Sequence, residues 1–593
     1  MSIQHRNNKI THKKRYTTKH KRTHTKRYTT KHKKRYTTKH KIKLRGGNIT
    51  NLTEKLDDLI NTEKVSKEEV KSDQYGKCLQ YTHDKMKNID LFSKSAATRI
   101  MFYKYIRGEI DFNEINKYLP GISGIDITLI KELWDLVFNM PKGSTHHEHY
   151  YSIGHTINFI KYLIDNLPSK YAIVYIYNLI PLKDNPHMKW AANKSLRLVT
   201  TTFINSLDID TFNTSLFLVT NKECTTQIKV VSYASQILTT DSINIEIDTS
   251  GRNIISTMAL VPVIYITPDT ENIYRGKEWD YLEFCASRFW QVISNEDVLP
   301  LYLTYIAEKA KEEKIQDVQI KYNITCWKYG TDNTYIDIYQ NETLRIVSAI
   351  IDSLFEKTNV SIHFIYGLQR MPKIDNPTNK EKQITNVLNK FRSARNLEND
   401  IPNINRKIIG YDIFGEEDKS NRTDMYYHKL VEFYNESPAT TAFMIHSGET
   451  NEIKYPVNDN LLLAYTLPGS IRIGHGISLW KYPELMKKIA GKICIELCPL
   501  SNSVLGYIPD PRNHPAIAYI NQNIDVSINT DNRGLLNYEF VTYDWFDLIV
   551  ALLLPYEVIV NIARSSIKYS SRINDINDEI YERWLKDYKV YIS

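Results

Sequence analysis

The chain has 593 residues, of which 42% are hydrophobic and 24% charged, ordinary values for a globular protein long enough for a large catalytic domain with accessory parts. Its net charge of +9 combines two opposed parts: residues 1–46 hold 18 Lys or Arg and no acidic residue, so the remainder carries a charge of −9. The most apolar late stretch, residues 548–554, stops at Pro555 and is too short to span a membrane.

The cysteines and the N-terminal sequence indicate the cellular compartment of the protein. The six cysteines are scattered without a CxxC pair, which argues against a disulfide framework and favours a reducing compartment. The N-terminus lacks the apolar core of a secretory signal. We therefore expect a soluble, intracellular protein with no membrane association, and the basic tail leaves a nuclear or virion-associated location open.

Residues 1–47 form the basic tail, in which KRYTTKHK occurs three times. Like charges this dense, without apolar periodicity, predict a disordered segment. Such a tail can bind nucleic acid non-specifically, because each neutralised phosphate releases a counterion, or it can simply solubilise or target the chain. Tyr16, Tyr28 and Tyr36 could stack on bases, which slightly favours nucleic acid.

Residues 48–75 are polar and charged and predict a linker. Residues 76–135 predict a helical accessory segment, in which Asp126–Phe138 has helical apolar spacing. Residues 136–593 predict the main domain, with an insertion at about 185–315. Expected strands are Asp317–Tyr322, Val360–Tyr366, Lys407–Ile413, Thr441–His446, Ser470–Gly474, Ile493–Leu497 and Ile524–Asn529. Their alternation with helical stretches predicts a parallel sheet wrapped by helices, as a barrel or an open sheet.

Histidines and an aspartate stand at the ends of several expected strands, where barrel enzymes place their chemistry. In PKGSTHHEHYY, His147 and His149 are two residues apart, so on a strand both point to one side, as in a two-histidine metal clamp. A lone HxH is more often an incidental polar cluster.

Three further motifs complete the set. FMIHSGET carries His446 and Glu449, IRIGHG carries His475 between glycines that would let a substrate approach, and VSINTDN carries Asp531. Taken singly, each residue is more simply a satisfied polar group in a loop or cap. Together they supply three imidazoles, a carboxylate and two spare acid–base groups, which is a complete hydrolytic zinc site.

PKG with HxH, then HSGET, RIGHG, ELCPLSNSVL and SINTDN occur in the order and approximate spacing of the adenosine deaminases, and the chain resembles this family over roughly residues 85–585. MPKG, GYDIFGEED and YDWF are most similar to the adenosine deaminase-related growth factor branch. The resemblance implies an α/β fold, the (β/α)8 TIM-type barrel of the metallo-dependent hydrolases, with the helical segment and the disordered tail as additions. In that branch the segment before the barrel contributes to a homodimer.

The resemblance also implies roles for individual residues. His147, His149, His446 and Asp531 would bind one Zn²⁺ per subunit. Glu449 would protonate a ring nitrogen of adenosine or 2′-deoxyadenosine, and His475 would deprotonate or orient the attacking water, with Asp531 accepting a hydrogen bond from it. Gly415 would hold the purine through its backbone amide, and Asn532 and His149 would also line the substrate site.

Three features depart from the family pattern. Asp531-Asn532-Arg533 stands where two aspartates and a proline are usual, although the amide of Asn532 could still donate to a nitrogen of the five-membered ring. Tyr150 and Tyr151 replace an acidic residue that helps hold a ribose hydroxyl. A basic tail stands where the growth-factor branch has a signal peptide.

Other residues and functions stay open. Arg370 is expected in a structural salt bridge, Asp412 as support for the substrate loop, and Cys494 and Cys498 in core packing. One alternative function is deamination of AMP or an N6-modified adenine nucleotide, although no phosphate-binding glycine loop is recognisable. The other is a weakened nucleoside-binding or structural protein that acts through its tail. The HxE and PCxxC motifs of polynucleotide-editing deaminases are missing.

Overall fold

A computed structural model describes residues 83–108, 110–118, 125–153, 157–176, 195–200, 217–220, 230–231, 279, 290–321, 325–332, 334–370, 377–397, 401, 403–418, 423–450, 459–536 and 538–593. All of them belong to one compact unit, Ser66–Ser593. The predicted tail and linker lie outside these residues, as does most of the predicted insertion.

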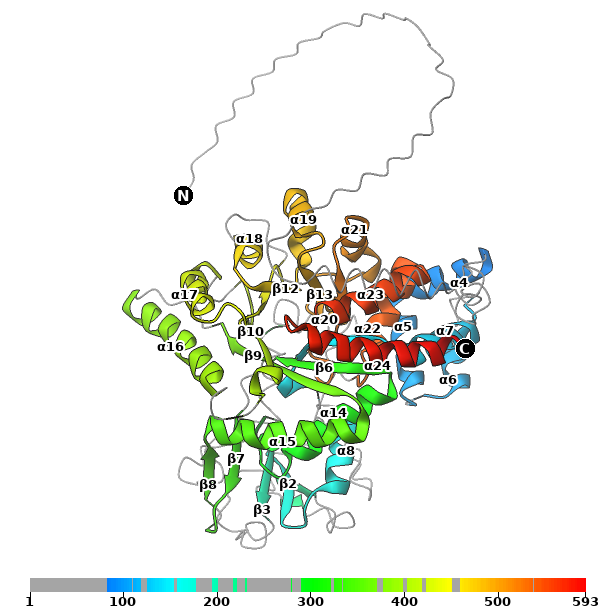
Figure 1. Cartoon of the computed structure of the whole chain (residues 1–593). Helices are drawn as coiled ribbons and strands as arrows, with labels where there is room; N and C mark the ends of the chain where they lie inside the picture. Colours follow the sequence, from blue (N-terminus) through cyan, green and yellow to red (C-terminus); the bar gives the residue numbers. More distant parts are fainter. Residues whose placement is uncertain are drawn as a thin grey trace, which may run out of the picture. The chain divides into compact units, whose positions relative to one another are not determined.

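Eight strands form one parallel sheet, and each of them pairs with the next of these eight in chain order. Figure 1 labels several of these strands and the helices around them. They are β1 (Gly143–His149), β6 (Ile315–Lys321), β9 (Ser361–Gln369), β10 (Ile408–Phe414), β11 (Phe443–Ser447), β12 (Ser470–His475), β13 (Cys494–Leu497) and β14 (Val526–Ile528). Buried parallel strands read as apolar runs. For that reason all seven predicted strands are confirmed, with ends shifted by one or two residues at most sites.

The first and last strands meet just beyond β14. The backbone N–H of Asp531 donates to the carbonyl of His147, and the N–H of His149 donates to the carbonyl of Asp531, each at 2.9 Å. This bridge between Glu148 and Asp531 nearly closes the sheet, and it confirms the (β/α)8 barrel.

Helices surround the barrel and connect its strands (Figure 1). Those that follow β1 and precede β14 are α8 (Ile157–Asn166), α13 (Trp290–Ile293), α14 (Leu299–Glu312), α15 (Gln340–Thr358), α16 (Pro377–Asn396), α17 (Thr423–Glu436), α18 (Asp459–Thr466), α19 (Pro483–Ile489), α20 (Pro499–Val504) and α21 (Ala516–Asn521). After β14 come α22 (Thr542–Leu552), α23 (Tyr556–Lys568) and α24 (Asn574–Ile592). Short 3-10 turns lie at Tyr150–Ser152, Ile404–Arg406, Ile477–Lys481 and Pro511–Asn513.

In the described residues that precede β1, the helices are α4 (His83–Lys94), α5 (Ala96–Ile106), α6 (Phe112–Tyr118) and α7 (Ile127–Asn139). Helix α7 confirms the predicted helix, and the side chain of Asp126 caps it. Aromatic rings join this group to α22, with Phe102 stacked on Phe546 at 5.6 Å between ring centroids and Trp134 edge-on to Tyr543 at 4.7 Å. The helices are thus part of the barrel's own core, and their predicted role in a homodimer stays a prediction.

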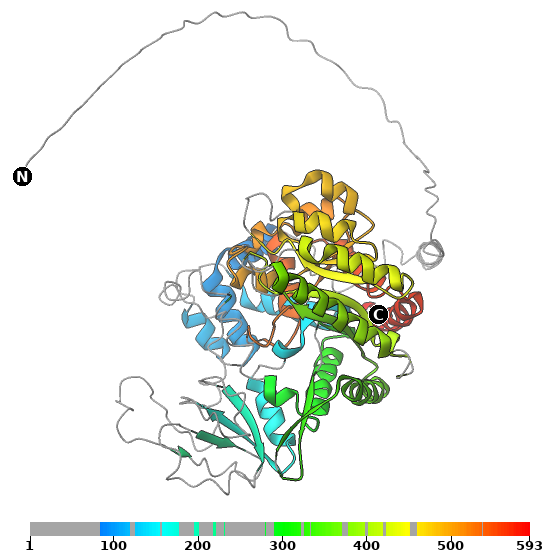
Figure 2. The same ribbon diagram turned by 90° about the vertical axis from the view of Figure 1, so that its left-hand side faces the viewer.

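A smaller antiparallel sheet combines β2 (Tyr171–Ile176) with three short strands of the predicted insertion: β3 (Ser195–Thr200), β4 (Phe217–Thr220) and β5 (Val230–Val231). A hairpin of β7 (Cys326–Tyr329) and β8 (Tyr335–Ile338) forms a third sheet. Figure 2 shows the strands of the smaller sheet at one side of the barrel. The sequence did not predict these antiparallel strands.

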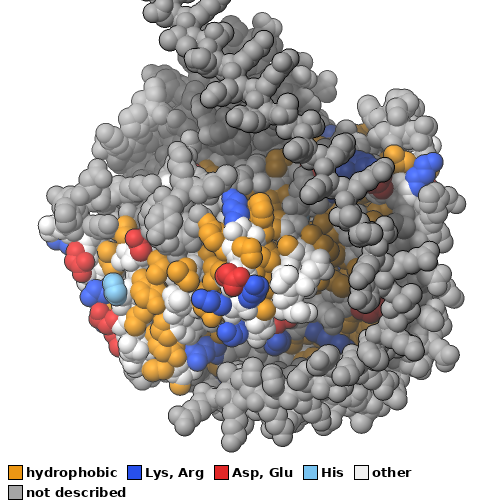
Figure 3. Space-filling view, turned by 90° about the horizontal axis from the view of Figure 1, so that it is seen from above, with side chains coloured by type: hydrophobic (Ala, Val, Ile, Leu, Met, Phe, Trp, Pro, Cys, Tyr) orange, Lys and Arg blue, Asp and Glu red, His pale blue; other side chains and the backbone are white. Residues whose placement is uncertain are grey.

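The surface seen in Figure 3 mixes hydrophobic side chains with Lys and Arg and with fewer Asp and Glu. Single exposed apolar residues such as Leu462, Trp480 and Ile517 are common on protein surfaces and need no special role. Of the helices that the structure describes, none has the length and apolar character needed to cross a bilayer.

Candidate metal and acid–base site

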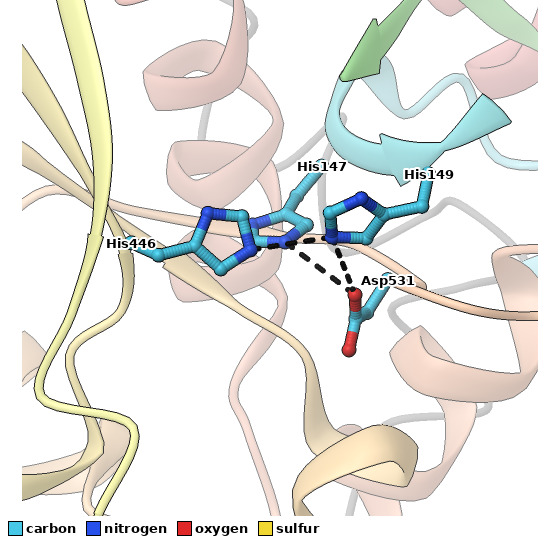
Figure 4. Close-up of side chains that lie close together, drawn as sticks. All are labelled: His147, His149, His446 and Asp531. Carbon is cyan, nitrogen blue, oxygen red and sulfur yellow. Dashed lines mark hydrogen bonds and ion pairs between the residues drawn. The ribbon is translucent and has the colours of Figure 1, made fainter. Parts of the chain in front are cut away.

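Four predicted ligands converge at the carboxyl-terminal end of the barrel. His147 and His149 come from β1, His446 from β11, and Asp531 follows β14; all four are buried, and one ligand atom of each lies within 4.8 Å of the others. Figure 4 shows their side chains pointing toward one another. The structure therefore brings together residues from opposite ends of the barrel sequence.

The spacing of these atoms fits a metal ion. His149 Nε2 lies 3.2 Å from His446 Nε2 and 3.2 Å from Asp531 Oδ1, and His147 Nε2 lies 3.5 Å from the same oxygen. Two atoms about 2.0–2.1 Å from one zinc ion, at the tetrahedral angle, lie about 3.3 Å apart. Within the described residues, His147 Nε2 has no hydrogen-bond partner although it is buried. Imidazole nitrogens and a carboxylate are ligands that suit zinc, so these four residues fit a zinc ion.

Strand geometry explains how β1 presents two histidines. The side chains between and beside them point elsewhere, as predicted: His146 bonds Ser527 Oγ at 3.1 Å through Nδ1, and Glu148 pairs with Arg533 at 2.9 Å. The remaining ligand follows a sharp turn, because Asp531 has a φ of 60°, unusual for a residue other than glycine.

The glycines on either side of His475 make room for neighbouring side chains. A Cβ on Gly474 would lie 3.1 Å from Cε1 of His147, and one on Gly476 would lie 2.9 Å from Cγ2 of Ile495. A side chain at either position would therefore crowd its neighbours, and the expectation that these glycines let a substrate approach stays a prediction.

Two carboxylates orient two of the histidines. Glu496 Oε2 accepts from His147 Nδ1 at 2.8 Å, and Asp412 Oδ2 accepts from His446 Nδ1 at 2.7 Å. Such bonds fix the ring and leave Nε2 free to bind a metal. Burial alone would raise the pKa of both carboxyls, but cationic neighbours, among them Lys321, hold both pKa values well below the usual range. Asp412 thus supports a histidine rather than the substrate loop.

Glu449 and His475 form a second grouping with Asp531, again within 4.8 Å. His475 Nδ1 lies 3.5 Å from Glu449 Oε1, and that oxygen has no hydrogen-bond partner among the described residues. Burial, and then the charges of Asp531 and Glu417, raise the pKa of Glu449 well above its usual value. Burial lowers the pKa of His475 to about 3. The pair therefore combines a carboxyl whose protonated form is favoured with an imidazole whose neutral form is favoured.

Neighbouring loops hold these groups in place. Ser501 Oγ donates to Asp531 Oδ2 at 2.6 Å, Asn502 Nδ2 lies 3.1 Å from His475 Nδ1, and Glu417 Oε2 accepts from the N–H of Glu449 at 2.9 Å. Sequence reasoning gave none of the three a role. The available signal was their place inside the ELCPLSNSVL and GYDIFGEED motifs.

Gly415 and Asn532 flank the cluster from two strand ends. Gly415 has a φ of 110°, and a Cβ there would meet only ordinary contacts, the closest 3.4 Å from Gln369 Cγ, so its backbone conformation is what requires glycine. Asn532 is buried, and its Oδ1 has no hydrogen-bond partner in the described part of the chain. The side-chain amide is therefore available to a bound ligand, and its oxygen and nitrogen are interchangeable by a flip.

The aromatic residues after HxH differ in position. The hydroxyl of Tyr150 donates to the carbonyl of Ile293 at 2.9 Å, whereas the ring of Tyr151 stacks on His149 with centroids 5.6 Å apart. Phe414 packs edge-on against His149 at 4.8 Å. Of the two tyrosines, Tyr151 is therefore the one that lies against a candidate ligand.

Arg370 and the two predicted core cysteines have structural surroundings. Arg370 Nη2 donates to the carbonyl of His446 at 2.6 Å, so it supports the ligand's backbone, and the predicted salt bridge stays a prediction. Cys494 and Cys498 are buried and form no disulfide. Cys498 also lies within 4.8 Å of His147 and His475, beside the site.

Comparison with known proteins now decides the family. A sequence model described as adenosine deaminase matches residues 281–580, half of the chain. The chain belongs to the adenosine deaminase family. The matched region contains His446, Glu449, His475 and Asp531, whereas the two histidines of β1 precede it and join the site through barrel closure.

Individual adenosine deaminases match over shorter stretches. An adenosine deaminase of Phlebotomus duboscqi is 31% identical over 191 residues, which cover 31% of this chain and 36% of the relative. Adenosine deaminase 2 of Dictyostelium discoideum is 33% identical over 182 residues, covering 30% of this chain and 33% of the relative. The chain thus spans about a third of the length of these curated relatives in the matches.

Proposed function

We propose that this adenosine deaminase family member catalyses zinc-dependent hydrolytic deamination of adenosine or 2′-deoxyadenosine to inosine or deoxyinosine and ammonia. The observation that carries the proposal is the meeting of four ligand side chains with a buried acid and a neutral base at one end of the barrel. The adenosine deaminases among the relatives support the substrate class.

His147, His149, His446 and Asp531 would hold one Zn²⁺ per subunit. A zinc ion bound there would lower the pKa of a ligated water to about 7 and so supply a nucleophile at neutral pH. Asp412 and Glu496 keep the two Nδ1 atoms occupied, so the Nε2 atoms of His446 and His147 are the ones available to the ion. Burial of all four ligands excludes competing water.

The adjacent pair, Glu449 and His475, would transfer the protons. Glu449 would donate its proton to the ring nitrogen beside the amino-bearing carbon, and His475 would accept a proton from the attacking water. The carbon–oxygen bond forms first. His475 would then pass its proton to the amino group, the carbon–nitrogen bond breaks, and the amino group leaves as ammonia while the new hydroxyl returns a proton to Glu449. Asp531, held by Ser501, would orient the water as a hydrogen-bond acceptor.

Purine recognition would use Gly415 and Asn532. The backbone amide of Gly415 and the side-chain amide of Asn532 would donate to ring nitrogens, with His149 and Tyr151 beside them. An amide donates to a nitrogen lone pair without first being protonated, so Asn532 can replace the usual aspartate there.

The alternatives are AMP or an N6-modified adenine nucleotide as substrate, and a weakened nucleoside-binding or structural protein. Zinc-loaded protein should be assayed on adenosine, 2′-deoxyadenosine, AMP and N6-methyl-AMP in parallel. Our proposal expects the highest kcat/KM for the two nucleosides. Faster turnover of AMP or N6-methyl-AMP would show that nucleotides are the preferred substrates. No turnover of any of the four would favour the non-catalytic alternative.

Homodimerisation through the segment at 76–135, nucleic-acid binding through residues 1–47 and an intracellular location are further proposals. Sedimentation of the purified chain tests the first of these. The helices of that segment are already packed on α22, so a dimer would have to use their outer faces.

A further inference from the structure

A fully buried lysine lies in the barrel beneath the metal site. Lys321 is the last residue of β6, and its side chain has no solvent exposure. Its ammonium lies 2.8 Å from Glu496 Oε2 and 3.1 Å from Asp412 Oδ2, and it donates to the carbonyl of Met444 at 3.1 Å. Three acceptors match the three N–H groups of an ammonium.

The two carboxylate oxygens that contact Lys321 are the ones that orient the histidines. Asp412 Oδ2 also accepts from His446 Nδ1, and Glu496 Oε2 also accepts from His147 Nδ1. The ammonium of Lys321 on β6 therefore contacts one carboxylate on β10 and one on β13. Through these carboxylates it is linked to the candidate ligands on β11 and β1. An isolated buried charge is costly, so the lysine and the carboxylates depend on one another.

We propose that Lys321 is a positioning residue for the metal site, which clamps Asp412 and Glu496 together and thereby fixes the orientation of His446 and His147. This inference rests on the proposed zinc site but not on the identity of the substrate. With the clamp in place, each carboxylate keeps one oxygen on an Nδ1–H, and the Nε2 atoms converge.

The clamp has two arms, the contact of Lys321 with Asp412 and its contact with Glu496, and they are unequal. Glu496 keeps a second cation if Lys321 is lost, because Arg472 Nε donates to its Oε1 at 2.6 Å. Asp412 has Lys321 as its only direct lysine or arginine partner among the described ion pairs. Removal of the ammonium should therefore release His446 more than His147.

Lys142 offers a matched control. It is also fully buried, and its ammonium also has three acceptors, the carbonyls of Phe138, Met140 and Glu313 at 2.9, 3.0 and 2.8 Å. None of these belongs to the metal site. Lys321→Met and Lys142→Met thus remove the same side chain and the same number of hydrogen bonds from two buried places. Burial lowers the pKa of Lys142 to about 7, so the two variants are compared below that pH, where both lysines carry a charge.

The test measures the zinc dissociation constant of the folded full-length protein by competition with a chelator, alongside the free energy of unfolding. We expect Lys321→Met to weaken zinc binding about 10–100-fold, the usual effect of losing a partner outside the ligand sphere. Lys142→Met should reduce stability while leaving zinc affinity within about twofold, and Lys321→Arg should recover part of the loss. Equal zinc affinities of the two methionine variants would overturn the proposal.

If Lys321→Met does not fold alone, the proposal is tested by comparing Asp412→Asn with the double variant that carries both changes. The double variant removes one charge of each sign, and it should bind zinc nearly as Asp412→Asn does, within about twofold, because the larger part of the Lys321 effect passes through Asp412 while Arg472 still holds Glu496. A further tenfold loss in the double variant would contradict a shared arm. Wild-type protein that binds no zinc would instead refute the proposed function itself.

Discussion

Replacement of Arg533 by methionine should destabilise the barrel strongly. The guanidinium is buried, lies 2.9 Å from Glu148 Oε2 and 3.5 Å from Glu313 Oε1, and donates to the carbonyl of Glu539 at 2.9 Å. Methionine would leave two buried carboxylates without this cation. Breaking a buried ion pair usually costs about 3–5 kcal/mol, and we expect a loss of stability in that range.

Glu148→Gln is the informative counterpart. It removes one carboxylate but leaves Arg533 with Glu313 and the carbonyl of Glu539, so we expect a smaller loss of about 1–3 kcal/mol. Both variants should be compared with wild type by urea unfolding. Burial raises the pKa of Glu148, so protonation relieves part of the Arg533→Met cost and the loss should grow with rising pH. A loss below about 1 kcal/mol for Arg533→Met, or an equal loss for Glu148→Gln, would refute this reasoning.

Three further outcomes are expected. Burial lowers the pKa of His514 to about 3, below its ordinary 6.5, and its Nδ1 accepts from the N–H of Ala516. Between these values the unfolded chain binds the extra proton, so His514 contributes a fall in stability of about 1.4 kcal/mol per unit as pH falls. His514→Asn should reduce the slope in urea titrations by that amount, while the other buried histidines, such as His475, keep their contributions. Glu449→Gln should abolish turnover of adenosine while zinc content stays at the wild-type level; full activity would remove Glu449 from the role of acid. Deletion of residues 1–46 should abolish salt-sensitive retention on DNA or RNA and leave turnover unchanged, whereas equal retention would show that the tail is not the binding element.

Sequence predicted the barrel well because its strands are buried and its motifs sit at strand ends. Alternation along β1 was enough to place His147 and His149 on one side and Glu148 on the other. Strand ranges such as Thr441–His446 were recognisable because a buried parallel strand is an apolar run between polar ends.

Pairing across the barrel could not be predicted in the same way. Lys321, Asp412 and Glu496 lie on three strands, and their contacts depend on how far the strands are staggered when the sheet closes. An isolated buried lysine in a β-pattern carries no sign of its partners. Arg533 was recognised only as a departure from the family pattern, and its partner Glu148 became evident once β1 met the loop after β14.

The central claim is that His147, His149, His446 and Asp531 hold one zinc ion on which deamination depends. Metal-free protein, prepared with a chelator, should be titrated with Zn²⁺ while the conversion of adenosine to inosine is followed. We predict a rate that rises from near zero and levels off at about one ion per chain, matching the single His₃Asp set. Full activity before any zinc is added, or a chain that takes up no zinc, would contradict the account.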